Sequence, residues 1–350
     1  MRQAVVFIAV AVMLVGAGAG YLIVDANGRT KPSITEGTPI PIASVLDGNI
    51  SIGSGPYSIA TNPNASRIYI ADGSNDLTVV DAVSHRVVAR VKLPAPSSSI
   101  TIDQKTGTVY ALVGGGIAIV SGATNAVVNE LPADFGFRLI AFDSSTDILY
   151  GAPAADYLVG VDALTGTVTQ NVSIGHWAGD ILVNPRLNLI YLTGCTRPFV
   201  CSPVLTVVNG TTAELQNVVG GATFTIDEQT GFVYASGMSQ LAALKSDGTM
   251  IYESYSDTCA AFVSMTDDPM LNQVIVAPAG YDYLLVYDGS NGTLSDMYSL
   301  PHAPHDVAFN PVTNETYVIV SGSLLTFKEP AGTGYANGTL IGSGQRCLFP

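Results

Sequence analysis

The sequence predicts an all-β fold made of seven copies of one four-stranded unit, and three observations support this. Short runs rich in β-branched and aromatic residues alternate with turn residues, and four such runs fit within Gly55–Pro94. A tyrosine-centred strand motif recurs at intervals of 41, 40, 41, 43, 41 and 42 residues. Charged residues make up only 12% of the chain and hydrophobic residues 47%, which suits strands buried on both faces. Four strands in about forty residues are typical of one blade of a β-propeller.

The first half of each copy predicts a hairpin between two strands, a and b. The anchor residues of strand b are Tyr69, Tyr110, Tyr150, Tyr191, Tyr234, Ile275 and Tyr317. Seven residues before each anchor stands an Asn or Asp: Asn62, Asp103, Asp143, Asn184, Asp227, Asp268 and Asn310. Four residues after each of these comes a small or turn-prone residue: Ser66, Gly107, Asp147, Asn188, Gly231, Asn272 and Asn314. An Asx side chain caps such a turn through the backbone, and Gly or Asn accepts the left-handed conformation that closes it.

The second half of each copy predicts strands c and d. A short β-run ends at Asp81, and similar runs end at Ser121, Asp162, Asn209 and Asp288, whereas the fifth and seventh copies depart from the pattern. One four-stranded sheet cannot bury both of its faces, but seven sheets packed radially can. An array of β-sandwiches would not keep this spacing over seven cycles. We therefore predict a seven-bladed β-propeller over residues 43–350.

The first copy also resembles the YVTN-type β-propeller repeat of bacterial and archaeal surface proteins. The resembling segments are Gly55-Pro56, Asn62-Pro63, RIYIAD at 67–72, LTVVD at 77–81 and VVA at 87–89. The tetrad is YIAD rather than YVTN, and the later copies keep only the Asx and tyrosine anchors. The resemblance implies a seven-bladed propeller that is exported or held at the cell surface. It implies no single activity, because propellers support binding, scaffolding and several enzyme chemistries.

Two segments are candidates for closing the ring. Asn49–Gly55 (NISIGSG) closely matches Asn337–Gly344 (NGTLIGSG), and both resemble a d strand that runs into the next blade. The N-terminal copy has no a or b strand of its own. Since an open ring would leave two free sheet edges, we expect this copy to pair with the last blade. It would form either the outer strand of that blade or an additional fifth strand.

The N-terminal residues 1–24 predict a signal peptide or a transmembrane anchor. Arg2 gives a basic start, the apolar run 4–24 follows, and Ala17-Gly18-Ala19 fits a cleavage site. The run of 21 residues is also long enough to span a bilayer uncleaved. Both alternatives place the rest of the chain outside the cell, secreted or anchored. Residues 25–42 are polar and contain three prolines, which predicts a linker.

Composition and motifs argue against several functions. The net charge is −14 and basic residues form no runs, so nucleic-acid binding is not expected. The single tryptophan argues against the tryptophan-docking repeats of quinone-dependent propellers, and we predict no cofactor. No metal site is predicted, because the four cysteines form no CxxC pair and His176 and His302 fall in nearly opposite blades. No GxSxG, HExxH or phosphate-binding loop is present.

Candidate binding residues gather on the upper face, which the b–c and d–a loops form. By register, Tyr57, Arg138, His176, Trp177, His302 and His305 lie near the upper mouth of the central channel. Arg197 and Phe199 lie in the longest b–c loop. We therefore expect a binding or scaffold module whose ligand is a surface protein or a glycan. The alternative is a hydrolase or lyase that acts on a small molecule at the channel mouth.

Cysteines and glycosylation sequons agree with an exported protein. We expect disulfides between Cys195 and Cys201 and between Cys259 and Cys347. The sequons are Asn49, Asn64, Asn171, Asn209, Asn291, Asn314 and Asn337. They fall in a–b turns, in c–d turns or on the rim, which predicts glycans on the lower face and rim and a bare upper face. The alternative is that Asn is simply common in tight turns. Sparse charge and few lysines further suggest an acidic exterior.

Overall fold

The structure is a computed structural model that describes residues 23–24, 30–31, 40–53, 55, 58–114, 116–132, 135–195, 203–213, 215–219, 223–237, 240–255 and 262–328. Pro39–Gly334 and Arg346–Pro350 form one unit, and Met1–Thr38 with Tyr335–Gln345 form another. In the latter, β1 (Ile23–Val24) pairs antiparallel with β2 (Thr30–Lys31). Within the described part of the chain, no helix has the length and apolar character to cross a bilayer. The rest of the predicted signal or anchor segment lies outside the described residues.

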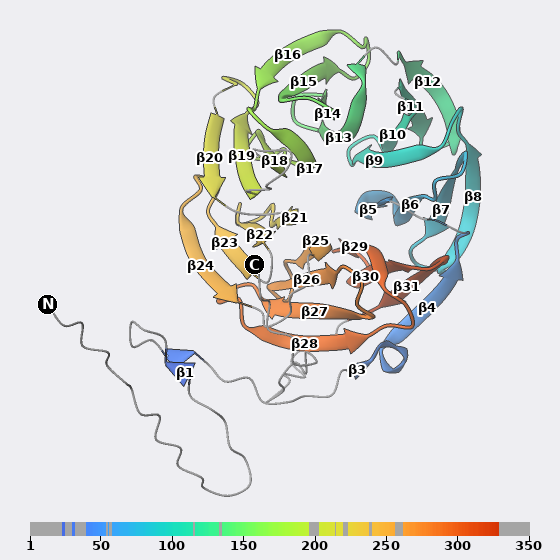
Figure 1. Ribbon diagram of the computed structural model, residues 1–350. Coiled ribbons are helices and arrows are strands. Elements are labelled where there is room, and N and C mark those ends of the chain that lie inside the picture. The colour runs from blue at the N-terminus through green and yellow to red at the C-terminus, as the bar shows by residue number, and fades with distance from the viewer. Residues whose placement is uncertain are drawn as a thin grey trace, which may run out of the picture. The chain divides into compact units, whose positions relative to one another are not determined.

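Pro39–Gly334 holds seven antiparallel sheets arranged radially around a central axis, which confirms the predicted seven-bladed propeller (Figure 1). Strands a to d run from the axis to the rim in chain order. Blade 1 has β5 (Ser58–Asn62), β6 (Arg67–Ala71), β7 (Asp76–Asp81) and β8 (Arg86–Lys92). Blade 2 has β9 (Ser97–Asp103), β10 (Thr108–Val113), β11 (Gly116–Ser121) and β12 (Ala126–Leu131). Blade 3 has β13 (Phe137–Asp143), β14 (Ile148–Pro153), β15 (Tyr157–Asp162) and β16 (Val168–Ser173).

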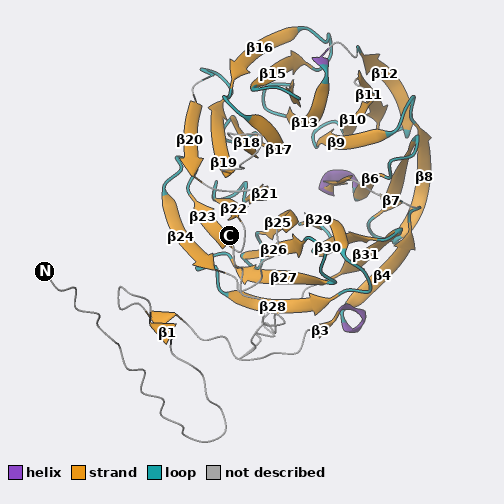
Figure 2. Ribbon diagram, in the orientation of Figure 1, coloured by secondary structure: helices purple, strands orange, loops and turns teal. Residues whose placement is uncertain are grey.

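The remaining blades follow the same order. Blade 4 has β17 (Trp177–Asn184), β18 (Leu189–Cys195), β19 (Pro203–Asn209) and β20 (Leu215–Val219). Blade 5 has β21 (Thr223–Ile226), β22 (Val233–Gly237), β23 (Gln240–Leu244) and β24 (Met250–Tyr255). Blade 6 has β25 (Phe262–Asp268), β26 (Gln273–Pro278), β27 (Tyr283–Asp288) and β28 (Leu294–Ser299). Blade 7 has β29 (Pro304–Asn310), β30 (Glu315–Val320) and β31 (Ser323–Phe327), and strands dominate all seven blades (Figure 2).

The N-terminal part of the ring closes it. β4 (Leu46–Ser51) pairs antiparallel with β31 and is the outer strand of blade 7, which decides between the two arrangements that the sequence left open. β3 (Ile40–Pro41) pairs in parallel with β28 and adds a fifth strand to blade 6. The short helix η1 (Ile42–Ser44) connects β3 to β4. The last residues of the predicted linker therefore belong to the sheet framework, whereas Asn337–Gly344 lies outside the described residues.

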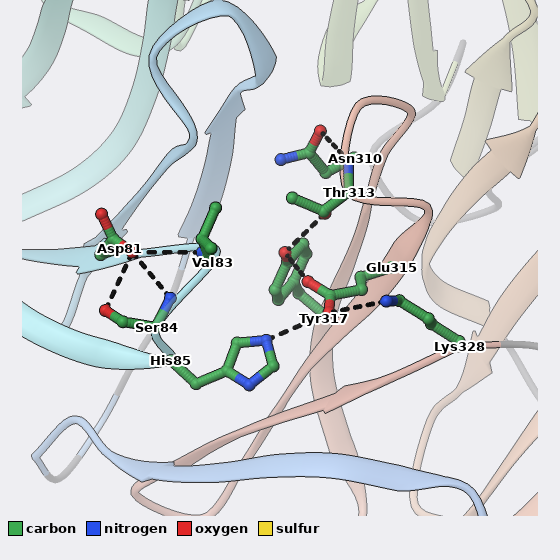
Figure 3. Close-up of polar contacts among 9 residues, drawn as sticks. All are labelled: Asp81, Val83, Ser84, His85, Asn310, Thr313, Glu315, Tyr317 and Lys328. Carbon is green, nitrogen blue, oxygen red and sulfur yellow. Dashed lines mark hydrogen bonds and ion pairs between the residues drawn. The ribbon is translucent and has the colours of Figure 1, made fainter.

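A polar cluster spans the seam between blade 7 and blade 1 (Figure 3). Nε2 of His85, in the c–d turn of blade 1, lies 3.1 Å from Oε1 of Glu315 at the start of β30. Glu315 is buried, and its Oε2 accepts a hydrogen bond of 2.6 Å from the hydroxyl of Tyr317. Nζ of Lys328 lies 3.8 Å from Oε1 of the same carboxylate. Covalently distant segments thus meet at the point where the ring closes.

Each repeat hairpin has the predicted geometry. Asp103, for example, accepts a hydrogen bond of 2.9 Å from the backbone N–H of Lys105 through its Oδ1. Asn184 caps its turn in the same way, with bonds of 3.1 Å from Arg186 and Leu187. All seven predicted turn residues have positive φ: Ser66, Gly107, Asp147, Asn188, Gly231, Asn272 and Asn314. The local spacing therefore dictates the local backbone.

The anchor tyrosines join neighbouring blades. Tyr69 and Tyr150 have no exposed surface, and the hydroxyl of Tyr234 donates a 3.4 Å hydrogen bond to the carbonyl of Gly289 in blade 6. A Cβ built at Gly210 would lie 3.1 Å from the hydroxyl of Tyr150. Small residues are therefore required where the c–d turn of one blade meets the tyrosine of the preceding blade.

Gly122→Ala tests this packing rule. A Cβ at Gly122 would lie 2.3 Å from the carbonyl oxygen of Gly107 and 2.7 Å from the hydroxyl of Tyr69. Because the first contact is with backbone, we expect a loss of about 1–3 kcal/mol in the free energy of unfolding, measured by denaturant titration. Gly179→Ala is the matched control, since the nearest atom to its Cβ would be 3.7 Å away. Equal unfolding midpoints for both variants would contradict the rule.

Candidate functional site

The seven a strands enclose a central cavity of about 670 Å³, which lies within the usual range for small-molecule pockets. Side chains alternate along each strand, so every second residue faces the cavity. In each blade, the residue four positions before the Asx cap faces the cavity. Together these residues form the upper ring: Ser58, Ser99, Leu139, Asp180, Thr223, Ser264 and Asp306. Two residues before it lies a lower ring: Ala60, Thr101, Ala141, Leu182, Thr225, Thr266 and Ala308. The residues between the two rings, such as Ile100, Ile140 and Ile181, are buried between blades.

A register shift lies directly above the upper ring in five blades. At each shift one residue has no Cα partner on strand b, as in a β-bulge. These residues are Ser98, Arg138, Gly179, Val263 and His305. All five are exposed, and we call them the mouth ring. A bulge turns a side chain out of the ladder, so this position of the repeat is the one that presents side chains at the channel entrance.

The predicted site residues occupy different positions in the structure. His305 lines the cavity, and Arg138 occupies the equivalent bulge position in blade 3. His302 is exposed in the connection before β29 and does not line the cavity. Tyr57, Arg197 and Phe199 lie outside the described residues.

His176 is turned into blade 4. Its ring is 4% exposed, with Nε2 2.8 Å from the hydroxyl of Thr206 and Nδ1 3.1 Å from the carbonyl of Trp177. Gly194 makes this placement possible, because a Cβ there would lie 2.2 Å from Nδ1. Trp177, the next residue, points outward with 58% of its surface exposed. Two adjacent residues at the start of β17 thus have opposite environments.

Two upper-ring carboxyl groups were not among the predicted site residues. Oδ1 of Asp306 accepts hydrogen bonds from Ser264 Oγ (2.5 Å) and the N–H of Val307 (2.9 Å), and Oδ2 accepts one from the N–H of Ile59 (3.0 Å). Asp306 therefore connects blades 6, 7 and 1. Burial raises the pKa of Asp306 to about 6. Its sequence signal is an acidic residue four positions before the Asx cap, at an inward position of the a strand.

Asp180 has fewer partners than Asp306. Its Oδ1 accepts a 2.8 Å hydrogen bond from the N–H of Ile181, and its Oδ2 lies 3.5 Å from the hydroxyl of Thr223. Burial, with a smaller contribution from the charge of Asp306, raises the pKa of Asp180 to about 7. Burial and the charge of Asp227 likewise raise the pKa of Asp267, the residue after Thr266 of the lower ring, to about 7. The upper ring thus holds two carboxyl groups whose pKa values are raised by burial.

Metal-ligating side chains are not clustered. In the described ranges, no three His, Cys, Asp or Glu side chains lie close enough to hold a metal ion. The disulfide predictions stay untested, because Cys201, Cys259 and Cys347 lie outside the described residues and only the backbone of Cys195 is described.

The sequons fall into two groups. In the turns, Nδ2 of Asn64 donates to the carbonyl of Gln104 (2.9 Å), and Nδ2 of Asn291 donates to Asp288 (3.1 Å). Asn209 caps its turn through Oδ1, and Asn314 is half-buried with positive φ. Asn49 and Asn171 lie exposed on outer strands, and Asn337 is outside the described residues. The nitrogen that would carry a glycan is therefore hydrogen-bonded at two of the turn sites.

Comparisons with known proteins agree on the fold. No protein-family model and no curated protein matches the chain. Among solved structures, the β-propeller domain of Cps50 (Swd1) from Myceliophteria thermophila is similar with a TM-score of 0.70 and 9% identity, over 81% of this chain and 99% of that one. Hydrazine synthase from Kuenenia stuttgartiensis is similar with a TM-score of 0.69 and 10% identity, over 80% and 97%. At such identities the likeness concerns the fold alone. The chain is therefore a seven-bladed β-propeller of four-stranded antiparallel blades.

Proposed function

We propose that this protein is an exported, cell-surface propeller of the YVTN-repeat kind that binds a surface protein or a glycan through its upper face. Trp177 is the observation that carries the proposal. A tryptophan with 58% of its surface in water is typical of an interaction site, where burial on binding recovers its large apolar area. Trp177 pairs with Cys195, the last residue of β18, at the upper end of blade 4.

Further exposed apolar side chains support the same face. Val263 of the mouth ring is 45% exposed, and Tyr281 in the b–c loop of blade 6 is 40% exposed. The rings of Tyr281 and Tyr283 lie 5.3 Å apart. Flat aromatic surfaces next to polar side chains suit both the apolar faces of sugar rings and the aromatic anchors of protein interfaces.

Trp177→Ala tests the proposal. The full chain is screened on glycan and protein arrays, and the affinity for the best ligand of each class is then measured. Loss of a central tryptophan costs about 2 kcal/mol or more, so we expect affinity for the true ligand to fall about thirtyfold or more. Leu164→Ala is the matched control, because Leu164 is 80% exposed in a c–d turn on the opposite face. Binding that survives Trp177→Ala but is lost with Leu164→Ala would place the ligand on the lower face.

Export and glycosylation belong to the same proposal. The apolar run 4–24 would direct export and, if retained, anchor the propeller to the membrane. We expect glycans at Asn49 and Asn171 in preference to Asn64 and Asn291, whose amide nitrogens are hydrogen-bonded. Glycopeptide mapping and N-terminal sequencing of the protein from its native source test both points.

A hydrolase or lyase at the channel mouth is the second candidate function. Asp180 favours it, because a carboxyl group whose pKa lies near 7 in a channel suits general acid or base catalysis, and His305 lines the same cavity. Turnover of small esters, lactones or uronides that disappears in both Asp180→Asn and His305→Ala would support the enzyme. Turnover that both variants retain would exclude the channel as its site.

A further inference from the structure

We infer that the central channel binds a small organic cation with two or more separated ammonium groups, held by Asp180 and Asp306 of the upper ring. The site lies inside the ring of a strands, so it differs from the upper-face loops and from Trp177. The two proposals can therefore fail separately.

The charge of the channel wall favours a cation. The residues that line the cavity include Asp180, Asp306 and Glu228, and they include no lysine or arginine. His305 is the one lining residue that can become cationic. The whole chain carries a net charge of −14. A narrow, low-dielectric passage with walls of one sign concentrates ions of the opposite sign.

The spacing of the carboxyl groups favours an extended ligand over a metal ion. Asp180 stands in blade 4 and Asp306 in blade 7, three blades apart in a ring of seven, while Glu228 directly follows the Asx cap of blade 5 at the lower end. Within the described residues no three such groups are close enough to coordinate one metal ion. A flexible diamine or triamine can reach carboxylates at separate positions because its charges are distributed along a chain.

Asp180 has acceptor capacity that the protein does not use. A carboxylate offers about four acceptor sites. Asp180 receives one short hydrogen bond, from Ile181, and its other oxygen has only the 3.5 Å contact with Thr223. Asp306 is held by three hydrogen bonds and would provide a fixed counter-charge. An ammonium group beside Asp180 would complete its hydrogen bonding.

The lower ring suits the rest of such a ligand. Ala60, Ala141, Leu182 and Ala308 present apolar surface toward the cavity, and three threonines present hydroxyl groups at the same level. The methylene groups of such a ligand would pack against the alanine and leucine side chains, and its ammonium groups would donate hydrogen bonds to the threonine hydroxyl groups. This alternation of carboxyl, apolar and hydroxyl groups along one passage matches the alternation of charge and methylene in an aliphatic polyamine.

Ligand binding is also coupled to protons. Burial raises the pKa of both upper-ring carboxyl groups, so part of the population is protonated near neutral pH. An adjacent ammonium group favours the ionised carboxylate, so binding releases protons. Proton release separates ionic binding in the channel from weak attraction to the acidic surface, where the carboxylates are already ionised.

Isothermal titration calorimetry of the full chain tests the inference, with putrescine, spermidine, calcium chloride and glycerol as probes. We expect saturable binding of spermidine and putrescine. At about pH 6.5 the binding enthalpy should change with the ionisation enthalpy of the buffer. Asp180→Asn should weaken spermidine binding about tenfold or more, whereas the exposed Asp282→Asn should leave it unchanged.

Three results would overturn the inference: no saturable polyamine binding, equal affinity in wild type and Asp180→Asn, or binding without proton release. Calcium binding that depends on Asp180 in the absence of polyamine binding would also overturn it and assign the channel to a metal. Thermal unfolding of Asp180→Asn verifies that the variant is folded. The buffer dependence of the wild-type enthalpy provides a test that needs no variant.

Discussion

A chain that begins at Gly53 is expected to lose cooperative unfolding, whereas a chain that begins at Pro39 should unfold like the full protein. The shorter chain lacks β3, β4 and Ile52. Ile50 and Ile52 are 7% and 0% exposed and pack with Ile68, Ile70 and Tyr317 at the seam of blades 7 and 1. Removing a buried isoleucine side chain costs about 2–5 kcal/mol, and total stability is about 5–15 kcal/mol. The Gly53 chain loses both isoleucine side chains and the pairing of β4 with β31. The summed cost exceeds the total free energy of unfolding of a typical domain.

Differential scanning calorimetry of the two truncated chains measures this effect. Ile52→Ala in the full chain tests the same contact with a smaller change. We expect it to lower the free energy of unfolding by about 2–5 kcal/mol. Val83→Ala is its control, because Val83 is 72% exposed in the adjacent turn and should change stability by less than about 0.5 kcal/mol. A Gly53 chain that melts at the temperature of the full protein would show that another segment closes blade 7.

Stability is expected to fall as the pH rises from about 4 to 7, by roughly 3 kcal/mol in total. The pKa values of Asp180 and Asp267 are about 7 in the folded protein, and that of Asp306 is about 6, against the ordinary aspartate pKa of 3.8. Between the unfolded and folded pKa values the folded state binds more protons than the unfolded state. The free energy of unfolding therefore decreases with rising pH through this window. The full shifts would give a larger change in the free energy of unfolding, which we reduce because none of the three side chains is completely buried.

At low pH the free energy of unfolding instead decreases as the pH falls. Backbone and side-chain hydrogen bonds from Thr165 lower the pKa of Asp162, and bonds from Ser84 lower the pKa of Asp81. Their stabilisation is present above about pH 4 and is lost as the pH falls below it. Stability should therefore be greatest near pH 4, where the acid loss ends and the loss at rising pH begins.

Denaturant titrations from pH 3 to 8 test both limbs. The double variant Asp180→Asn, Asp267→Asn should reduce the loss of stability that occurs as the pH rises, whereas Asp162→Asn should change only the loss of stability at low pH. Stability that stays constant or rises from pH 4 to 7 would contradict the raised pKa values of Asp180, Asp267 and Asp306. Loss of folding at pH 3 would contradict the hypothesis of an acidic exterior.

The sequence by itself determined the repeat. The Asx cap, the left-handed turn residue and the anchor tyrosine all lie within eight residues of one another, and each hairpin forms from contacts within that span. Seven such hairpins at nearly constant spacing leave the radial arrangement as the way to bury both faces of every sheet. The predicted fold class was therefore confirmed in its number of blades and in the geometry of every a–b turn.

Only the tertiary structure decided which side chains face the channel and what they contact. The register placed His176 near the mouth, but the space above Gly194 and the hydroxyl of Thr206 direct its ring into the blade. Asp306 became a ring-closing residue through Ile59, 247 positions away, and His85 met Glu315 across 230 positions. Such contacts connect different repeats, and no local spacing encodes them. They form because ring closure brings the first and last blades together, and burial then determines the pKa values of the carboxyl groups that line the axis.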